Sequence, residues 1–227
     1  MPGGFMEIED SLRGMGIRVA VLVLDNVTVR DSSQELSQKI QALIEEFKAR
    51  YDDASMLTSD PIVRAYRKTL WRLGIDPTKV RPSSEALARR ILRGKPVPRI
   101  NNVVDPGNAA SLYYLVPIGL YDLDKTRPPL RLLRCGEACY FKPIGSESKV
   151  LGKGTPVIVD ASNRVVHVYP HRDAMETRIT METRRVLAVS LGAEGVPDER
   201  LVDSLKLFVE LARIDNPGLK SSDIELI

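Results

Sequence analysis

Residues 98–108 read PRINNVVDPGN, and after a short apolar run residues 117–125 read PIGLYDLDK. Both stretches place side-chain amides, prolines and carboxylates directly beside apolar residues. Buried polar groups of the backbone and side chains need hydrogen-bond partners. Because so many polar groups stand close together here, the two stretches predict the wall of a pocket.

The polar residues of the first stretch also have a structural interpretation. Their spacing prevents Asn101, Asn102, Asp105 and Asn108 from all facing one way, so some are expected to bond the backbone and shape turns. Asn108 could also cap a short helix over residues 109–115. Both interpretations stay open.

Length and composition predict an ordinary folded protein. The chain has 227 residues, of which 28% are charged and 43% hydrophobic. The longest apolar run, residues 19–24, is far shorter than the roughly 20 residues of a membrane helix, and the start MPGG lacks the basic segment of a secretory signal. We expect a cytoplasmic protein without a membrane contact, in which Cys135 and Cys139 are reduced thiols.

Helices and strands follow from local signals. Residues 17–29 predict two short β-rich stretches with a turn at Asp25-Asn26, and Ser32 with Glu35 predicts a helix start. Further helices are predicted from Asp60 to Gly74, over 84–93 and over 197–214. Short β-rich runs are predicted at 130–134, 138–141, 157–160, 164–169 and 185–191. The mixture predicts an α+β fold with an N-terminal tail at 1–14 and a single domain at 15–227.

Positive charge is concentrated in one segment. The chain carries +3 overall, but residues 64–99 hold eleven basic and two acidic residues, which leaves +9 there and −6 elsewhere. Arginine-rich helix faces are usually solvated surface. Here acids are absent from the neighbouring turns, and arginine binds phosphate through two hydrogen bonds, which favours a polyanion. The candidate polyanion-binding residues are Arg64, Arg67, Lys68, Arg72, Arg81, Arg89, Arg90, Arg93 and Arg99.

The segment lacks an RNA-recognition signature with paired stacking aromatics. We therefore expect contacts with the backbone of a folded RNA rather than sequence readout. Affinity for that RNA should fall as the salt concentration rises.

The two opening stretches, together with Tyr66-Arg67, LGIDP at 73–77 and RPS at 81–83, resemble one family. It is the editing and tRNA-binding (B3/B4-type) region of the phenylalanyl-tRNA synthetase β subunit, with its free-standing relatives. The resemblance spans about residues 17–196, and no synthetase core lies beside it. It implies an α+β fold in three layers, with β-sandwich-like sheets of short mixed strands covered by helices.

The resemblance also implies a cavity for the amino acid esterified to the tRNA 3′ end. Residues 171–180, HRDAMETRIT, resemble the stretch that lines its other side. Arg172 could equally be a structural partner of Asp173 or Asp122. The pocket residues implied by the resemblance are Asn102, Asp105, Asn108, Gly119, Asp122, Arg172, Asp173 and Thr177.

Two positions depart from the family pattern. Gly119 stands where synthetase versions usually have histidine, and Val189 stands where bacterial versions have a glutamate that recognises a phenolic hydroxyl. A buried tyrosine hydroxyl without a partner would cost roughly 1–3 kcal/mol. Tyrosine specificity therefore does not follow.

Hydrolysis of an aminoacyl ester requires a positioned water more than a strong nucleophile. The sequence has no Gly-x-Ser-x-Gly elbow and no evident Cys–His pair, so a covalent route through a side chain is not expected. The route that the resemblance implies uses water, backbone groups and the substrate's ribose hydroxyls. His167 and His171 are the two residues that could titrate near neutrality, either as general bases or as surface and packing residues.

A zinc site is a rival interpretation of the cysteines and histidines. Cys135 and Cys139, like His167 and His171, are four residues apart, an interval that structural zinc sites tolerate. In an extended strand, however, positions four apart are separated by about 13 Å. We expect no metal and no cofactor.

These observations predict a free-standing tRNA-binding editing module that is not itself a synthetase. It would hydrolyse the ester of mischarged aminoacyl-tRNA in trans, with the tRNA acceptor end as its partner and a synthetase as a further candidate partner. A tRNA- or RNA-binding protein without turnover is the first alternative, because a fold can persist without its activity. A small-molecule enzyme that reuses the cavity is the second.

Overall fold

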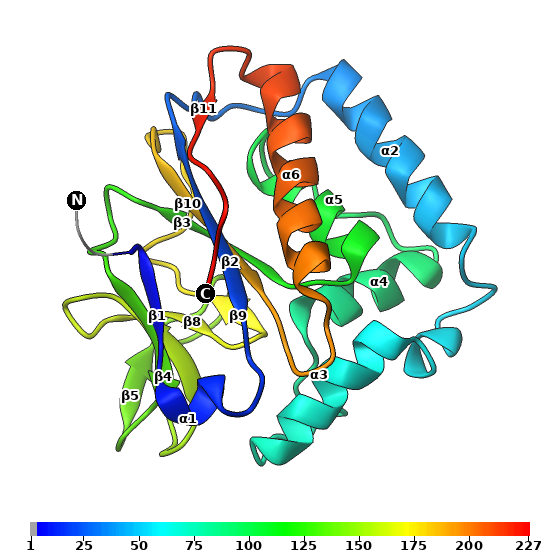
Figure 1. Cartoon of the computed structure of the whole chain (residues 1–227). Helices are drawn as coiled ribbons and strands as arrows, with labels where there is room; N and C mark the ends of the chain where they lie inside the picture. The colour runs from blue at the N-terminus through cyan, green and yellow to red at the C-terminus, as the bar shows by residue number, and fades with distance from the viewer. Residues whose placement is uncertain (1–3) are drawn as a thin grey trace.

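The computed structural model describes residues 4–227 (Figure 1). Its helices are α1 (Asp10–Arg13), α2 (Gln34–Lys48), α3 (Pro61–Arg72), α4 (Ser83–Leu92), α5 (Val104–Tyr114) and α6 (Asp198–Asp215), with a 3-10 turn at Met56–Thr58. The strands are β1 (Met6–Ile8), β2 (Val19–Asp25), β3 (Ile118–Asp122), β4 (Leu130–Arg134), β5 (Cys139–Phe141), β6 (Lys149–Leu151), β7 (Pro156–Val159), β8 (Val165–Val168), β9 (Arg172–Asp173), β10 (Val186–Leu191), β11 (Lys220–Ser221) and β12 (Glu225–Leu226).

These elements form three layers. The middle layer is the sheet β11-β2-β10-β3, with β12 also paired to β2. Helices α5 and α6 cover one face of it, and α2 packs against both helices (Figure 1). The second sheet, β1-β4-β7-β8-β9, lies against the other face. The predicted three-layer α+β architecture is confirmed.

Strand β2 shows why the middle sheet is buried on both faces. Its residues alternate in direction, as in any strand. Ala20, Leu22 and Leu24 join the core shared with the helices. Val19 and Val21 join the core between the two sheets. This explains the continuous apolar run in the sequence, which is typical of a strand with two buried faces.

The stretch after β2 differs from the prediction. The turn is present, since Asn26 has a φ of 61°, but the second β-rich stretch is not a strand. Thr28 N bonds to the Asn216 side chain at 2.8 Å instead of joining a ladder. Helix α2 is capped by Ser33, whose Oγ accepts from Leu36 N at 3.1 Å. The prediction that Ser32 caps this helix is wrong, because the Ser32 hydroxyl donates to Asp105 Oδ2 at 2.7 Å.

The signals for α3 and α4 are confirmed. Asp60 Oδ1 accepts from Ile62 N at 2.9 Å, and Pro61 takes the first helical position. Gly74 and Gly94 follow the two helices with φ of 77° and 73°, a left-handed conformation that glycine adopts without steric cost.

Part of the predicted N-terminal tail is structured. Strand β1 pairs in parallel with β4, with Met6 opposite Leu130. Met6 and Ile8 are buried against the core between the sheets. A strand of three residues is too short for its alternation to be recognised in the sequence. Among the helices formed by residues 4–227, none is long and apolar enough to cross a membrane.

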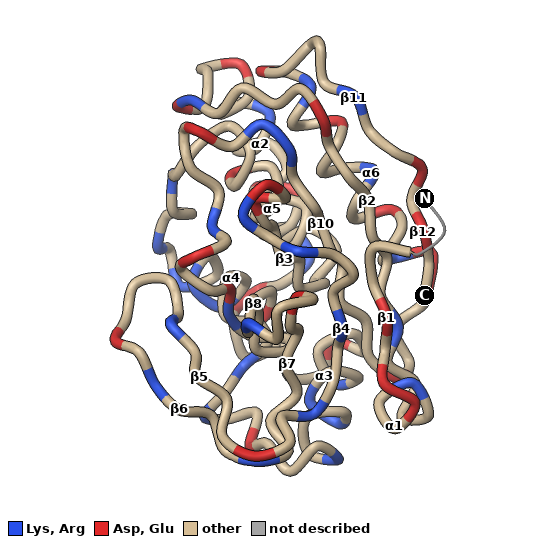
Figure 2. Tube along the Cα trace, turned by 90° about the vertical axis from the view of Figure 1, so that its left-hand side faces the viewer, with Lys and Arg blue, Asp and Glu red and all other residues tan. Residues whose placement is uncertain are grey.

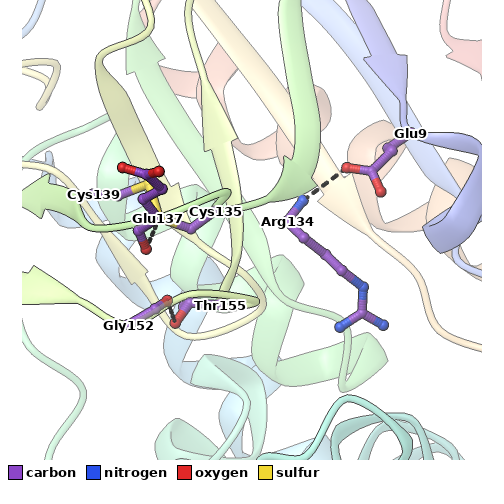
Figure 3. Close-up of a disulfide and its surroundings, with 7 residues drawn as sticks. All are labelled: Glu9, Arg134, Cys135, Glu137, Cys139, Gly152 and Thr155. Carbon is purple, nitrogen blue, oxygen red and sulfur yellow. Dashed lines mark hydrogen bonds between the residues drawn. A yellow bond between two sulfur atoms is a disulfide. The ribbon is translucent and has the colours of Figure 1, made fainter.

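Cys135 and Cys139 form a disulfide at the start of the β5–β6 ribbon (Figure 3). The expectation of reduced thiols is therefore wrong for this structure. The turn after β4 brings the two Cα atoms to 6.1 Å, a separation that a disulfide requires. Both sulfurs are consumed, so they are not free to bind zinc. Within residues 4–227 no three His, Cys, Asp or Glu side chains are placed to hold a metal ion.

Candidate functional site

A cleft of about 420 Å³ lies where α4, α5, β3 and the β8–β9 segment meet. The β5–β6 ribbon lies beside β8 (Figure 2), and the loop that joins its two strands adds Ile144 to the wall. The lining residues are Ser83, Ala86, Leu87, Arg90, Pro98, Ile100, Asn108, Ser111, Ile118, Ile144, His167, His171, Arg172 and Asp173.

His167 and Asp173 form a hydrogen-bonded pair in the cleft wall. Strands β8 and β9 place them opposite each other, and His167 Nδ1 lies 2.7 Å from Asp173 Oδ1. The His167 side chain is 2% exposed and that of Asp173 is 25% exposed. His167 Nε2 is fully buried and has no partner among the described residues. Both residues line the cleft, and the Asp173 carboxylate is the more exposed member of the pair.

His171 has the opposite arrangement. Its Nδ1 lies 3.0 Å from the carbonyl oxygen of Arg81, which can only accept, so Nδ1 must carry the proton. Burial, with repulsion from Arg172, lowers the pKa of His171 below its ordinary 6.5. The ring is therefore neutral at pH 7, with a lone pair on Nε2. This atom is not sealed from solvent, unlike Nε2 of His167.

Two arginines add positive charge to the cleft. Arg172 Nη1 donates to the carbonyl of Ile144 at 3.1 Å, and Arg90 Nε donates to the carbonyl of Pro96 at 2.7 Å. Both side chains are exposed. Arg172 thus ties the ribbon loop to β9 instead of pairing with Asp173 or Asp122.

The structure brings three of the eight predicted pocket residues into the cleft: Asn108, Arg172 and Asp173. Asn108 lies inside α5 and does not cap a helix. The helix begins at Val104, and Asn101 Oδ1 accepts from Val103 N and Val104 N at 3.0 and 2.8 Å. Asp105 and Pro106, which the sequence suggested as the entry to a helix, lie in the first turn of α5.

Gly119 lies next to the cleft and carries no side chain into it. Tyr121, two residues along β3 on the same face, folds back over Gly119. A Cβ at position 119 would lie 2.7 Å from Tyr121 Cζ, and closer still to its hydroxyl. Burial raises the pKa of Tyr121 well above its ordinary range. Val189 is paired with Gly119 and is buried between the sheets, away from the cleft lining.

Asn102 and Asp105 lie outside the cleft and hold loops. Asn102 Nδ2 donates to Thr28 O, and its Oδ1 accepts from Arg30 N, both at 3.0 Å. Asp105 Oδ1 accepts from Ile100 N at 2.8 Å, and the residue faces a separate hollow of about 300 Å³ between α2 and residues 94–99.

Asp122 and Thr177 also lie outside the cleft. Asp122 Oδ2 accepts from Thr183 Oγ1 at 2.7 Å, and Asp122 N donates to the carbonyl of Thr177 at 2.8 Å. Both residues are buried where β3 ends. They fix the chain that leads from β9 to β10.

A sequence profile described as "B3/4 domain" matches residues 65–198, which is more than half of the chain. The chain belongs to this family. The comparison with curated proteins gave no match. Among solved structures, the B3/4 chain is similar to a crystal structure of an N-terminal fragment of the phenylalanyl-tRNA synthetase beta-subunit from Pyrococcus horikoshii. The TM-score is 0.50 at 15% identity, and the alignment covers 96% of this chain and 51% of the other. The likeness concerns the fold, and this protein spans about half of the Pyrococcus chain.

Five of the eleven basic residues in residues 64–99 of the B3/4 chain are paired with acids. Glu85, which is 1% exposed, accepts from Arg67 and Arg89 at 2.6 and 2.7 Å, and Arg81 lies 4.0 Å away. Burial opposes ionisation of Glu85, but the hydrogen bonds from Arg67 and Arg89 outweigh it and lower the pKa of the carboxyl. The expectation that these arginines lack acidic partners is wrong.

Glu194, far away in sequence, pairs with Lys68 and Arg72 at 3.0 and 2.7 Å. The remaining candidates differ. Arg64, Arg90, Arg93 and Arg99 are exposed, and none has an ion pair within residues 4–227. Arg90 lines the cleft, and Arg99 lines the separate hollow between α2 and residues 94–99.

Sequence reasoning missed the apolar part of the cleft. Leu87 and Ile118 are half-buried in its wall, while Ile100 and Ile144 are 53% and 37% exposed. The exposed isoleucines gave no signal, because nothing in a single sequence distinguishes an apolar residue at a cleft from one in the core. Leu87 has the helical spacing of a core residue, so its place at the cleft could not be told from the sequence.

Proposed function

We propose that this protein binds the aminoacylated 3′ end of tRNA and hydrolyses the ester that joins amino acid and ribose, acting in trans. The observation that carries this proposal is the neutral His171 in a cleft that also contains two arginines. The residues of this cleft lie within residues 65–198, the part of the chain that matches the family. The fold likeness to a fragment of a tRNA synthetase subunit supports the choice of tRNA as the polyanion.

The chemistry needs only water and the cleft residues. His171 Nε2 accepts a proton from water as the water oxygen attacks the ester carbonyl carbon. The new C–O bond forms, the ester C–O bond breaks, and the proton passes to the departing ribose oxygen. Free amino acid and uncharged tRNA are the products. A fixed geometry and the general base supply the rate enhancement.

The arginines are suited to phosphate. Arg90 lines the cleft, and Arg99 lines the neighbouring hollow between α2 and residues 94–99. Arg90, Arg93 and Arg99 are exposed and have no ion pair within residues 4–227, so their charges are available to a phosphate backbone. Guanidinium groups bind phosphate oxygens in a two-point geometry. The paired residues Arg67 and Arg89 hold α4 in place instead.

Deacylation assays on a panel of mischarged tRNAs test this proposal. The wild-type protein should release amino acid from at least one of them, and His171→Asn should slow release by about 10²- to 10⁴-fold while tRNA binding persists. Glu210→Gln, at an exposed position on α6, is the matched control and should behave as wild type. Saturable tRNA binding without release would instead indicate a binding module. Neither binding nor release would favour a small-molecule enzyme.

A further inference from the structure

Asp173 is the one acid among the described residues that line the cleft. Its neighbours there include the cations Arg90 and Arg172, so its negative charge is an exception in the site. The carboxylate is partly accessible, with a 25% exposed side chain. A single anion in a cationic cleft is a selective position for a positively charged group of a ligand.

His167 holds this carboxylate in a fixed orientation. Its ring is buried, and its Nδ1 engages Asp173 Oδ1 at 2.7 Å. The second oxygen, Oδ2, has no hydrogen-bond donor within residues 4–227. A carboxylate held by one oxygen and free at the other can accept a charge-assisted hydrogen bond from a ligand. His167 acts here as a positioning residue.

An apolar wall completes the site. Leu87 on α4 and Ile118 on β3 line it from the inside, and Ile100 and Ile144 are 53% and 37% exposed. Exposed apolar side chains that gather at a concave site are typical contacts for a ligand. The site therefore combines an anion with an apolar surface.

We infer that Asp173 binds the free α-ammonium group of the aminoacyl ester and that Leu87, Ile100, Ile118 and Ile144 contact an apolar amino-acid side chain. This inference rests on the proposed function for the ester itself. The substrate class is then an aminoacyl ester with an unblocked amino group and an apolar side chain. Peptidyl and N-acylated esters, which lack the positive charge, are excluded.

Calorimetric binding of a non-hydrolysable probe tests the inference without turnover. The probe is 3′-deoxy-3′-(L-leucylamino)adenosine, compared with the analogue in which a 4-methylpentanoyl group replaces leucyl and the amino group is missing. Wild-type protein should bind the leucyl probe roughly ten- to a hundredfold more tightly, the range expected for a hydrogen bond to a charged group. Equal affinities, or no binding of either probe, would overturn the inference.

Two variants add specificity to this comparison. Asp173→Asn should remove the difference between the two probes and leave the affinity for the amine-free analogue unchanged. Asp203→Asn, on α6 and outside the cleft lining, should keep the difference. If Asp173→Asn still prefers the leucyl probe, another group binds the ammonium and the assignment is wrong.

Hydrolysis of leucyl-tRNA and N-acetyl-leucyl-tRNA separates this inference from the proposed function. Equal hydrolysis of both by wild type would overturn the ammonium site and leave the deacylase proposal standing. Amine-dependent probe binding without hydrolysis of any tRNA would support the ammonium site and overturn the deacylase proposal.

Discussion

Glu85 and Arg67 form a two-point ion pair between α4 and α3, with Oε1 2.6 Å from Nη2 and Oε2 3.0 Å from Nε. Arg89 adds a third hydrogen bond, to Oε1 at 2.7 Å. Removal of a buried carboxylate that accepts several hydrogen bonds from arginines leaves the charges of those arginines without a partner. The basic segment thus contains a structural centre as well as exposed cations.

Replacing Glu85 with Gln should destabilise the fold by about 3 kcal/mol, since breaking a buried pair leaves Arg67 and Arg89 uncompensated. Urea unfolding measures this change. Glu194→Gln, which removes a carboxylate that is 42% exposed, is the control and should change the stability far less, because solvent screens its ion pairs. Equal costs for the two variants would contradict the structural role of Glu85.

The same carboxyl predicts a pH dependence of stability. Because the pKa of Glu85 is lowered from its ordinary 4.5, its contribution is fully present above that pH. It is lost as the pH falls through the lowered value in the folded state. Unfolding of wild type and Glu85→Gln followed from pH 7 to pH 3 should therefore show the two stabilities converging at the acidic end.

His171→Asn should lower the deacylation rate about 10²- to 10⁴-fold, the usual contribution of a general base. The lowered pKa of His171 sets the wild-type pH profile. Because this pKa lies below 6.5, the midpoint of the acidic decline in rate should also lie below pH 6.5. A rate that already declines through pH 7, or an unchanged rate in the variant, would count against His171.

Arg93→Glu and Arg99→Glu should each weaken tRNA binding and reduce the slope of log affinity against log salt by about one for each phosphate that the variant no longer binds. Lys206→Glu on α6 makes the same charge change at an exposed residue paired with Asp203 and should leave the slope unchanged. Titrations at several salt concentrations distinguish the two. Identical slopes in all variants would place the tRNA elsewhere.

Gly119→Ala should destabilise the protein by about 1–3 kcal/mol, because the added methyl group collides with Tyr121. Gly152→Ala is the matched control, since a Cβ there meets nothing within 4 Å. In urea unfolding, Gly119→Ala combined with Tyr121→Leu should cost less than the sum of the single changes. Strict additivity would show that the two positions do not interact.

Elements with strong local signals were predictable from the sequence. Helix α3 has its capping Asp60, its Pro61 and a terminal glycine within one segment, so no tertiary information was needed. Ser32 and Ser33 show the limit, since both can cap and only the hydrogen bond to Asp105 decides between them. The family resemblance supplied the layers, which local signals alone do not give.

The cleft could be predicted only in part. Its residues come from six separate segments, and only their packing shows that Asn108 enters it while Asn102 holds a loop. Glu85 was counted as one acid among many bases because glutamate is usually exposed. Its burial, and the commitment of Arg67 and Arg89 to it, depend on how α3 meets α4.

The way Tyr121 covers Gly119 also restricts how this site can change over evolutionary time. A histidine at position 119 requires the space that the tyrosine ring occupies. A substitution at 119 must therefore be preceded by replacement of Tyr121 with a smaller residue. Covariation between them is therefore expected among homologues. A lineage that has acquired this glycine–tyrosine arrangement will not regain a side chain at 119 through one mutation.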